Sequence, residues 1–406
     1  MDALMLPLPK DWEIKTFRDI STINQGLQIP ISQRLKAPTE HAKFYITIQA
    51  LNNRKEFEYI KTYNESVVCH KDDILMTRTG NTGMVITNIE GVFHNNFFKI
   101  NFDRTLINKD FLVYFLSLEQ TQKTILRKAG TSTIPDLNHN DFYSLSIPLP
   151  PLNEQSAIAN ILSALDRYLY ALDALILKKE GVKKALSFEL LSQRKRLKGF
   201  NQAWQRVRLG DIILSLKTGL NPRKFFKLNT PNANNYYVTV RELEEYTIKF
   251  THQTDRIDDN ALSLCLKRSN LEKDDVLFSG TGTIGKVSII KENPNNWAIK
   301  EGIYSIKPNK KIVFPRFLMF CFENLNIQND IKSKSSEGIV KSISMNDLQQ
   351  ITIPLPPLNE QNAIANILSA LDNEITSLKN KKHQFENIKK ALNHDLMSAK
   401  IRVLKK

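Results

Sequence analysis

The side chains with the clearest chemical potential in this sequence are polar groups beside glycine-rich or aromatic stretches. Gln and Asn can pair bidentately with adenine, and Arg can pair bidentately with guanine. Glycine also lets a loop approach a phosphate backbone closely. We therefore predict nucleic-acid-contacting groups in both halves of the chain, with an ordinary solvated surface role as the alternative for each. The candidates are Gln49, Asn52, Asn53, Arg78, Asn81, Thr82, Arg223, Lys224, Lys227, Arg241, Thr281, Thr283 and Lys286.

One glycine-rich segment resembles a nucleotide-binding loop. Residues 280–286 fit GxGxxG and, up to the last position, GxxxxGK[ST]. Both patterns require a helix directly afterwards, because its N-terminus holds the phosphate. The following residues, Val287-Ser-Ile-Ile, favour a strand, and Val287 supplies no hydroxyl for magnesium. The first half keeps only Gly80-x-x-Gly83. We predict a tight turn between two strands in both places.

No catalytic constellation is present in the sequence. Gly-x-Ser-x-Gly, His-Glu-x-x-His and the Asn/Asp-Pro-Pro-aromatic tetrapeptide of adenine methyltransferases are all missing, and Cys and His never take zinc-site spacing. The recurring pairs Asp72-Asp73 and Asp274-Asp275 suggest a metal site, but neighbouring side chains of an extended segment face opposite ways. We therefore predict solvated turn acids, no catalytic residue, no metal ligand and no cofactor bound by this chain.

Composition places the chain among globular proteins with a polyanionic partner. The 406 residues carry 57 Lys and Arg against 42 Asp and Glu, a formal charge of +15, and such a balance favours nucleic acid. The length exceeds what one hydrophobic core usually serves. No run approaches the ~20 apolar residues that span a bilayer. With three scattered cysteines and no secretory leader, we expect a cytoplasmic protein without disulfides or membrane contact.

The dominant feature of the sequence is an internal duplication. Residues 147–166 and 353–372 read IPLPPLNEQ[SN]AIANILSALD and agree at nineteen of twenty positions, 206 residues apart. The same offset continues to Arg196 and Arg402. Upstream the copies match loosely, as in Trp12 and Trp204, and the second copy carries about fourteen extra residues. We predict four segments: variable domains at 1–146 and 198–352, each followed by a near-identical helical segment at 147–197 and 353–406.

The near-identical segments have the pattern of long helices. Prolines end the preceding strand, Asn153 and Asn359 are candidate N-caps, and no proline follows for over forty residues. Apolar residues recur in heptads, which predicts an antiparallel coiled coil between the two helices, with a polar layer or kink near Gly181, Lys183 and Lys389. The alternative is that each helix packs on its own domain. The predicted seam consists of Ile158, Leu162, Leu165, Leu169, Leu172, Leu186, Ile364, Leu368, Leu371, Ile375, Leu378 and Leu392.

The variable domains mix strand-like and helical patterns, and we predict the α+β class for them. Residues 45–48, 73–77 and 286–290 favour strands, whereas residues 109–128 favour a helix. The first domain has 17 basic and 16 acidic residues, and residues 199–352 have 22 and 16. The first domain is therefore barely basic, so we expect strong nucleic-acid binding to need partner subunits.

Two divergent domains, each followed by a helix that opens with IPLPPLNEQ, resemble the specificity subunit of type I restriction–modification enzymes over the whole chain. The resemblance implies two target recognition domains that each read one half of a bipartite double-stranded DNA sequence. It also implies that the helices set the spacing and dock two modification subunits, with restriction subunits joining the full complex. S-adenosylmethionine, ATP and Mg would then be used by those partner subunits, and this chain would be non-catalytic.

Two further function classes are compatible with parts of the pattern. One is a self-contained methyltransferase–specificity fusion, which would need an S-adenosylmethionine or nucleotide motif. The other is a coiled-coil scaffold without a DNA function, which weakly diverged globular domains would favour. Neither feature is present in the sequence. The DNA-recognition subunit is therefore the interpretation that the residues favour.

Overall fold

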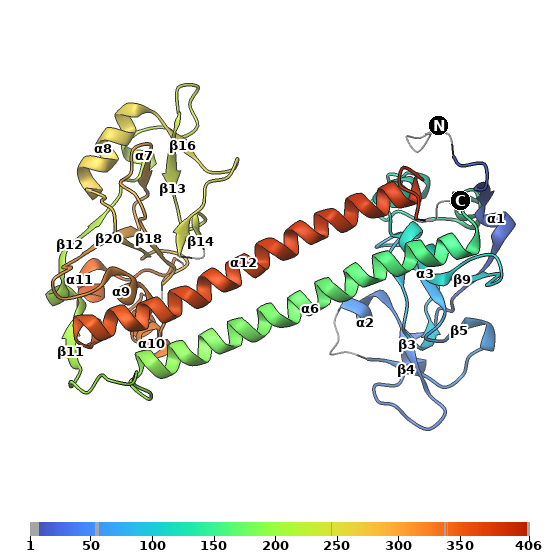
Figure 1. The fold of residues 1–406 in the computed structure, drawn as a ribbon, viewed down its shortest axis with the longest axis horizontal. Coiled ribbons are helices and arrows are strands. Elements are labelled where there is room, and N and C mark those ends of the chain that lie inside the picture. The colour runs from blue at the N-terminus through green and yellow to red at the C-terminus, as the bar shows by residue number, and fades with distance from the viewer. Residues whose placement is uncertain (1–7, 53–56, 245, 337, 339, 404–406) are drawn as a thin grey trace. The chain divides into compact units, whose positions relative to one another are not determined.

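The fold is given by a computed structural model, which describes residues 8–52, 57–244, 246–336, 338 and 340–403. The chain divides into two compact units. Unit 1 comprises residues 1–174 and 380–406, and unit 2 comprises residues 175–379. Each unit holds one globular domain and a stretch of both long helices, α6 (Leu152–Leu191) and α12 (Leu358–Met397), green and red in Figure 1.

The globular domain of unit 1 contains two four-stranded sheets, β2-β9-β6-β7 and β4-β3-β8-β5, and a two-stranded ribbon, β1-β10. All neighbours are antiparallel except β3 and β8. The strands are β1 (Glu13–Thr16), β2 (Ser21–Gln25), β3 (Lys43–Ile46), β4 (Tyr59–Ile60), β5 (Val68–Cys69), β6 (Ile74–Thr77), β7 (Val85–Ile86), β8 (Gly91–Phe93), β9 (Phe97–Phe102) and β10 (Ser146–Leu149). The helices are α1 (Phe17–Ile20), α2 (Ile48–Asn52), α3 (Lys109–Leu116), α4 (Glu119–Ala129) and α5 (His139–Tyr143), with 3₁₀ turns at Ile31–Gln33 and Glu65–Val67.

The globular domain of unit 2 has a similar topology, but its second sheet has three strands and it carries one additional ribbon. Its sheets are β12-β20-β17-β18 and β16-β13-β19, with ribbons β11-β21 and β14-β15, and β13 pairs with β19 in parallel as β3 does with β8. The strands are β11 (Gln205–Arg208), β12 (Ile213–Thr218), β13 (Asn235–Val238), β14 (Leu243–Glu244), β15 (Thr247–Ile248), β16 (Arg256–Ile257), β17 (Val276–Ser279), β18 (Val287–Ile289), β19 (Trp297–Ile299), β20 (Ile303–Pro308) and β21 (Thr352–Leu355). The helices are α7 (Pro222–Phe225), α8 (Asp259–Ser269), α9 (Pro315–Cys321), α10 (Leu325–Ser333) and α11 (Met345–Gln349), with a 3₁₀ turn at Leu209–Ile212. Helix α8 occupies part of the extra sequence of the second copy.

Strand β6 is apolar at successive positions because both of its faces are covered by a hydrophobic core. Successive side chains of a strand point to opposite faces of the sheet, and all four residues of β6 are buried. Ile74 and Met76 join the core under the helices, whereas Leu75 joins the core of the second sheet. In unit 2, β17 divides two cores in the same way, with Leu277 facing the second sheet. The strand therefore holds the two halves of each domain together.

The long helices begin at Leu152 and Leu358, one residue before the predicted N-caps. The proposed N-caps Asn153 and Asn359 lie inside the first turn, because the carbonyl of Pro151 accepts from the backbone N–H groups of Glu154 and Gln155 at 2.9 and 3.0 Å. The carbonyl of Pro357 does the same in the second copy. The residue before each helix therefore supplies its main-chain oxygen, and the Asn153 side chain accepts only from its neighbour, Glu154 N.

Within each unit the two helix segments run antiparallel. In unit 1, Asp166 pairs with Lys389 and Asp173 with Lys382, so the number rises on one helix as it falls on the other. In unit 2, Lys179 pairs with Glu374 at 2.7 Å, and Lys183 pairs with Asp372 at the same distance. The α+β class and the antiparallel pairing of the helices are thus confirmed.

Most local predictions from the sequence agree with the structure. Residues 74–77 and 287–289 are strands, and the strand at 45–48 lies two residues earlier, at Lys43–Ile46. The single helix expected over 109–128 is two helices, because the chain breaks at Ser117 and Leu118. No helix among the described residues is both long and apolar enough to cross a membrane.

Candidate functional site

Each domain presents a glycine turn between two antiparallel strands, β6–β7 in unit 1 and β17–β18 in unit 2. Gly80 and Gly83 have φ of 86° and 91°, and Gly282 and Gly285 have 78° and 90°. These left-handed conformations favour glycine. The N–H of the last glycine donates back to the strand, to Thr77 O at 2.8 Å or Ser279 O at 2.9 Å. Strand β18 follows the second turn directly, so the phosphate-binding loop that needs a helix is excluded.

A second loop is fixed to each glycine turn. In unit 1, Arg78 donates to both carboxylate oxygens of Asp136, at 3.1 and 2.7 Å, and the Thr82 hydroxyl donates to Pro135 O at 2.7 Å. In unit 2, main-chain hydrogen bonds fix the second loop to the turn, and Gly282 N donates to Lys341 O at 2.8 Å. Arg78 and the buried Thr82 are therefore engaged in holding the loop, and not freely presented to a ligand.

The remaining candidates of unit 1 lie on exposed backbone near the turn. Gln49 and Asn52 are exposed on the short helix α2, and Asn81 is exposed at the turn. A side-chain carbon added at Gly80 would lie 3.4 Å from Ile48 at the start of α2, so the helix and the turn are neighbours. Asn53 lies outside the described residues. Unit 1 thus brings amides from two elements to one region.

The candidates of unit 2 fall into two groups. Thr281, Thr283 and Lys286 are exposed on the turn, and the Lys286 ammonium lies 3.5 Å from Val240 O, next to Arg241. The Arg241 guanidinium donates to Asp255 at 2.8 Å. The other group is exposed on α7 or just after it, where Phe226 packs on Tyr237 in a separate core cluster. That group consists of Arg223, Lys224 and Lys227.

The first acid of each recurring pair is more exposed than the second. Asp72 is exposed and pairs with Lys109 and Arg104, whose hydrogen bonds lower the pKa of its carboxyl. The prediction of a solvated acid is wrong for Asp275, which is 1% exposed and accepts from Ser305 Oγ at 3.1 Å and Glu272 N at 3.0 Å. Burial raises the pKa of Asp275 to about 6. Among the described residues, no group of three or more potential metal ligands gathers.

A buried glutamate of the repeated PLPPLNEQ motif accepts three side-chain hydrogen bonds in each unit. In unit 1, Glu154 accepts from Trp12 Nε1 at 3.1 Å and from Arg402 Nε and Nη2 at 2.7 and 2.8 Å. Its counterpart Glu360 is fully buried and accepts from Trp204 Nε1 at 3.0 Å and Arg196 Nη2 at 2.7 Å. The glutamate that starts one helix therefore binds the arginine that follows the other helix.

The glutamine beside each glutamate is also fully hydrogen-bonded. Gln155 donates to Leu106 O and Pro150 O at 2.9 and 2.8 Å and accepts from Asn108 N at 2.8 Å. Gln361 makes the same three bonds to Ile312 O, Pro356 O and Phe314 N. A buried amide is costly unless all its groups are paired. The motif therefore fixes where each helix leaves its domain.

All members of the predicted seam are buried or half-buried. The first turns belong to the domain cores, since Ile158 and Leu162 join the core of unit 1 and Ile364 and Leu368 that of unit 2. Leu172, at 5% exposed, and Ile176 and Ile375, at 6%, lie further along the helices. The helices thus pack on their own domains at the start and against each other beyond it, which combines the two alternatives left open by the sequence.

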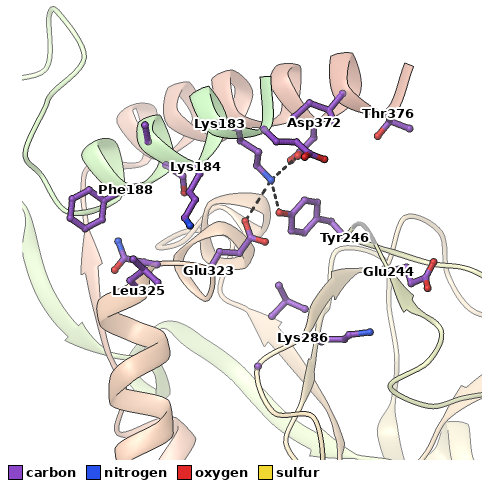
Figure 2. Close-up of a pocket in the computed structure, with 18 of the residues that line it drawn as sticks. Lys183, Lys184, Phe188, Glu244, Tyr246, Lys286, Glu323, Leu325, Asp372 and Thr376 are labelled. Carbon is purple, nitrogen blue, oxygen red and sulfur yellow. Dashed lines mark hydrogen bonds and ion pairs between the residues drawn. The ribbon is translucent and has the colours of Figure 1, made fainter. Parts of the chain in front are cut away.

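The lysines within the seam form the expected polar layers. Lys183 contacts Asp372 at 2.7 Å and Glu323 at 3.7 Å, and it hydrogen-bonds the Tyr246 hydroxyl (Figure 2). Burial raises the pKa of both Glu323 and Tyr246. In unit 1, the matching Lys389 pairs with Asp166, which accepts from the Tyr114 hydroxyl at 2.7 Å. Each lysine is therefore neutralised by the other helix.

An open groove borders each polar layer, and Figure 2 shows the one of unit 2. The groove of unit 2 has a volume of about 1160 Å³ and that of unit 1 about 780 Å³. Both are lined by the last turns of one long helix, by the other helix and by the segment before α4 or α10. Part of the lining corresponds at the repeat offset of 206, as for Lys183, Lys184 and Ala185 with Lys389, Lys390 and Ala391. The groove of unit 2 is also lined by β14 and the glycine turn, which do not line the groove of unit 1. The chain therefore carries two related grooves.

The comparison with protein families agrees with this duplicated arrangement. A family model described as the type I restriction modification DNA specificity domain matches residues 9–179 and again residues 201–387. The chain belongs to this family. The two matches begin near Trp12 and Trp204, and they contain both glycine turns and the first turns of both long helices.

Relatives and solved structures extend the match over the whole chain. A putative type I restriction enzyme specificity subunit, MjaX, from Methanocaldococcus jannaschii is 27% identical over 98% of this chain and 95% of its own length. The MjaVIII specificity subunit of the same organism is 25% identical with the same coverage. The S subunit from M. genitalium has a TM-score of 0.62 at 19% identity and covers 98% of this chain and 99% of its own. A chain of another type I system has a TM-score of 0.60 at 17% identity, covering 97% and 99%. These structures share the fold.

The buried Glu–Trp–Arg clusters were not predicted as a unit from the sequence. The repeats had shown that Trp12, Glu154 and Arg402 each have a counterpart. Arg402 and Glu154 lie 248 positions apart, so no local pattern joins them. The available signal was that a rare tryptophan and a single arginine persist in both copies. The clusters form one structural site in each specificity domain.

Proposed function

We propose that this protein is the DNA-recognition subunit of a type I restriction–modification complex. Each globular domain would read one half of a bipartite duplex target. The observation that carries the proposal is the contrast between the repeats: the helix motifs and their contacts are nearly identical, whereas the exposed residues of the glycine turns differ. Equivalent partners require equivalent surfaces, and two different half-sites require two different ones.

The net charges of the two domains indicate that they contribute differently to DNA binding. Residues 1–146 have a formal net charge of +1 and residues 199–352 of +6. Sequence-independent attraction to DNA grows with the number of phosphates neutralised. The first domain should therefore contribute mainly base contacts, and stable binding should require the complete complex.

Two matched surfaces support docking of two modification subunits. The grooves share lining positions in the last turns of the long helices, and three pairs of exposed apolar residues accompany the helices at matching positions. These pairs are Leu106 and Ile312, Leu152 and Leu358, and Val182 and Ile388. Because an aliphatic side chain is exposed at the same positions in both copies, one kind of partner can bury both. The modification subunits would use S-adenosylmethionine, and restriction subunits with ATP and Mg would complete the complex in the cytoplasm.

The docking proposal is tested by placing a charge on each surface separately. Val182 is 46% exposed and Ile388 is 50% exposed, so neither substitution disturbs a core. Val182→Asp is expected to leave one modification subunit bound, Ile388→Asp to leave the other, and the double variant to leave none, as read by native mass spectrometry of the purified complex. Full occupancy in the double variant contradicts the proposal.

The recognition proposal is tested by mapping methylated bases in cells that produce the complex. Replacing residues 1–146 by the corresponding domain of a relative is expected to change one half of the methylated sequence and to leave the other half as it was. A change in both halves, or in neither, contradicts independent reading. The purified single chain is expected to transfer no methyl group from labelled S-adenosylmethionine. Methyl transfer by that chain would favour the fusion enzyme instead.

A further inference from the structure

Two loops expose an aliphatic side chain at corresponding positions of the repeats. Ile134 is 62% exposed and Val340, 206 positions later, is 58% exposed. Single exposed apolar residues are common on protein surfaces, so exposure alone carries little weight. Among the described residues, however, the other matched exposed pairs lie on the long helices or beside their first turns. Ile134 and Val340 instead lie next to the glycine turns, to which the following residues Pro135 and Lys341 are hydrogen-bonded.

The loop of unit 1 is held in place on both sides of Ile134. Asp136 N donates to Ala129 O at 3.1 Å, which closes the loop on itself. The carboxylate of Asp136 binds Arg78, and Thr82 binds Pro135 O, so the loop is tied to the turn. Ser132 Oγ also donates to Ile134 O at 2.7 Å. The exposed isoleucine is therefore presented by a braced loop.

In unit 2, the described residues around Val340 make comparable hydrogen bonds with different partners. Ser336 N donates to Ser342 O at 2.8 Å and closes the loop, and Ile343 N donates to Gly280 O at 2.9 Å. Leu137 and Ile343, three positions after the exposed residues, are both fully buried. Each loop thus buries one aliphatic side chain, at 137 or 343, and exposes another to solvent, at 134 or 340. Two independent sets of contacts preserve one exposed aliphatic group.

Two kinds of partner could cover this group. A modification subunit that docks identically on both units would favour identical loops, as it does on the helices. The loops instead differ at almost every position, for example Pro135 and Asp136 against Lys341 and Ser342. Lys341 and Lys286 are exposed beside Val340 and on the adjoining turn, and cations at these places suit a phosphate backbone. The DNA duplex is the partner that these observations favour.

We propose that Ile134 and Val340 are specificity-determining residues that each contact the 5-methyl group of a thymine in the half-site read by their own domain. Apolar contact with this methyl group is an established element of major-groove recognition. Side chains that wedge between base pairs are Phe, Leu, Ile, Met or Pro, a set that includes isoleucine but not valine, so a role shared by both positions favours contact with the methyl group. The proposal rests on the proposed DNA-recognition function, and it gives the two divergent domains one shared reading element.

The experiment compares Ile134→Ala and Val340→Ala with matched controls. Leu126→Ala in unit 1 and Leu264→Ala in unit 2 remove side chains that are 45% and 49% exposed and have no exposed apolar counterpart in the other copy. Each variant complex is purified with its modification subunits. The probes are a duplex of the mapped methylated motif and duplexes in which one thymine at a time is replaced by deoxyuridine, which lacks the methyl group.

Ile134→Ala is expected to bind the motif roughly tenfold more weakly, as for loss of one base contact, with binding to unrelated duplex unchanged. One deoxyuridine in the half-site of the first domain should weaken the wild-type complex by a similar factor and leave the variant unaffected. Val340→Ala should behave likewise in the other half-site, and both controls should bind as wild type. The unfolding temperature of all four variants should equal that of the wild type.

The proposal is overturned if no deoxyuridine affects the wild-type complex, if the variants bind like their controls, or if they lose modification subunits. Failure of the proposed function looks different, because the wild-type complex would then yield no bipartite methylated motif at all. A clear wild-type motif combined with normal binding by Ile134→Ala rejects only the thymine contact.

Discussion

Removing the buried charge at Glu360 should destabilise unit 2 selectively. Its carboxylate is fully buried and holds both Arg196 and Trp204. Breaking a buried ion pair by removing one partner costs about 3–5 kcal/mol. The Arg196 side chain is 26% exposed, so water recovers part of its solvation, and Glu360→Gln keeps an acceptor for Trp204. We therefore expect a loss of about 2–3 kcal/mol in the free energy of unfolding, after discounting for this exposure.

Calorimetry and urea denaturation can measure this loss. A unit spanning residues 175–379 loses about 2–4 °C in Tm per kcal/mol, so the transition of unit 2 should fall by about 5–10 °C. Glu292→Gln removes an exposed carboxylate of the same unit and should change Tm by less than about 1 °C. The matching substitution Glu154→Gln should lower the transition of unit 1 instead.

A double-mutant cycle with Arg196→Met separates the ion pair from other effects of the substitution. The two changes together should cost clearly less than the sum of the single changes, by about 1–2 kcal/mol. A loss below about 1 kcal/mol for Glu360→Gln, or full additivity with Arg196→Met, would refute the view that this contact joins the start of one helix to the end of the other.

Two further predictions concern the helices and a buried acid. Inserting seven seam-compatible residues after both Ala174 and Asn380 lengthens each helix by ~10 Å, about three base-pair steps. Methylation mapping should then show a longer spacer with unchanged half-sites. Inserting only two residues instead rotates the apolar stripe by ~200° and should destabilise the protein. An unchanged spacer in an active complex would mean that the helices do not set the distance. Because Asp275 is protonated more readily in the folded state, its contribution to stability is complete below pH ~4 and is lost as pH rises through about 6. Asp275→Asn should therefore remove a decline of about 2–3 kcal/mol between these pH values, and an unaltered difference between pH 4 and pH 7 in denaturant unfolding would contradict the raised pKa.

The sequence alone determined the features that depend on neighbouring residues or on the repeat itself. The glycine turns follow from φ values that glycine adopts readily at Gly80 and Gly282. The strand nature of residues 287–289 follows from β-branched residues. The duplication and the heptads predicted two domains with two paired helices. A 3.5-residue periodicity specifies that one stripe of each helix is buried, but it does not specify which surface covers that stripe.

The tertiary structure decided which groups are buried together. Asp275 occupies the same position of the repeat as Asp73, which is half-buried, but Asp275 is fully buried and bonded to Ser305. Arg78, expected to face a ligand, is turned toward Asp136, 58 positions away. Glu154 meets Arg402 only because the second helix returns to the first domain. Such contacts depend on the folding of distant segments, and local propensity carries no information about them.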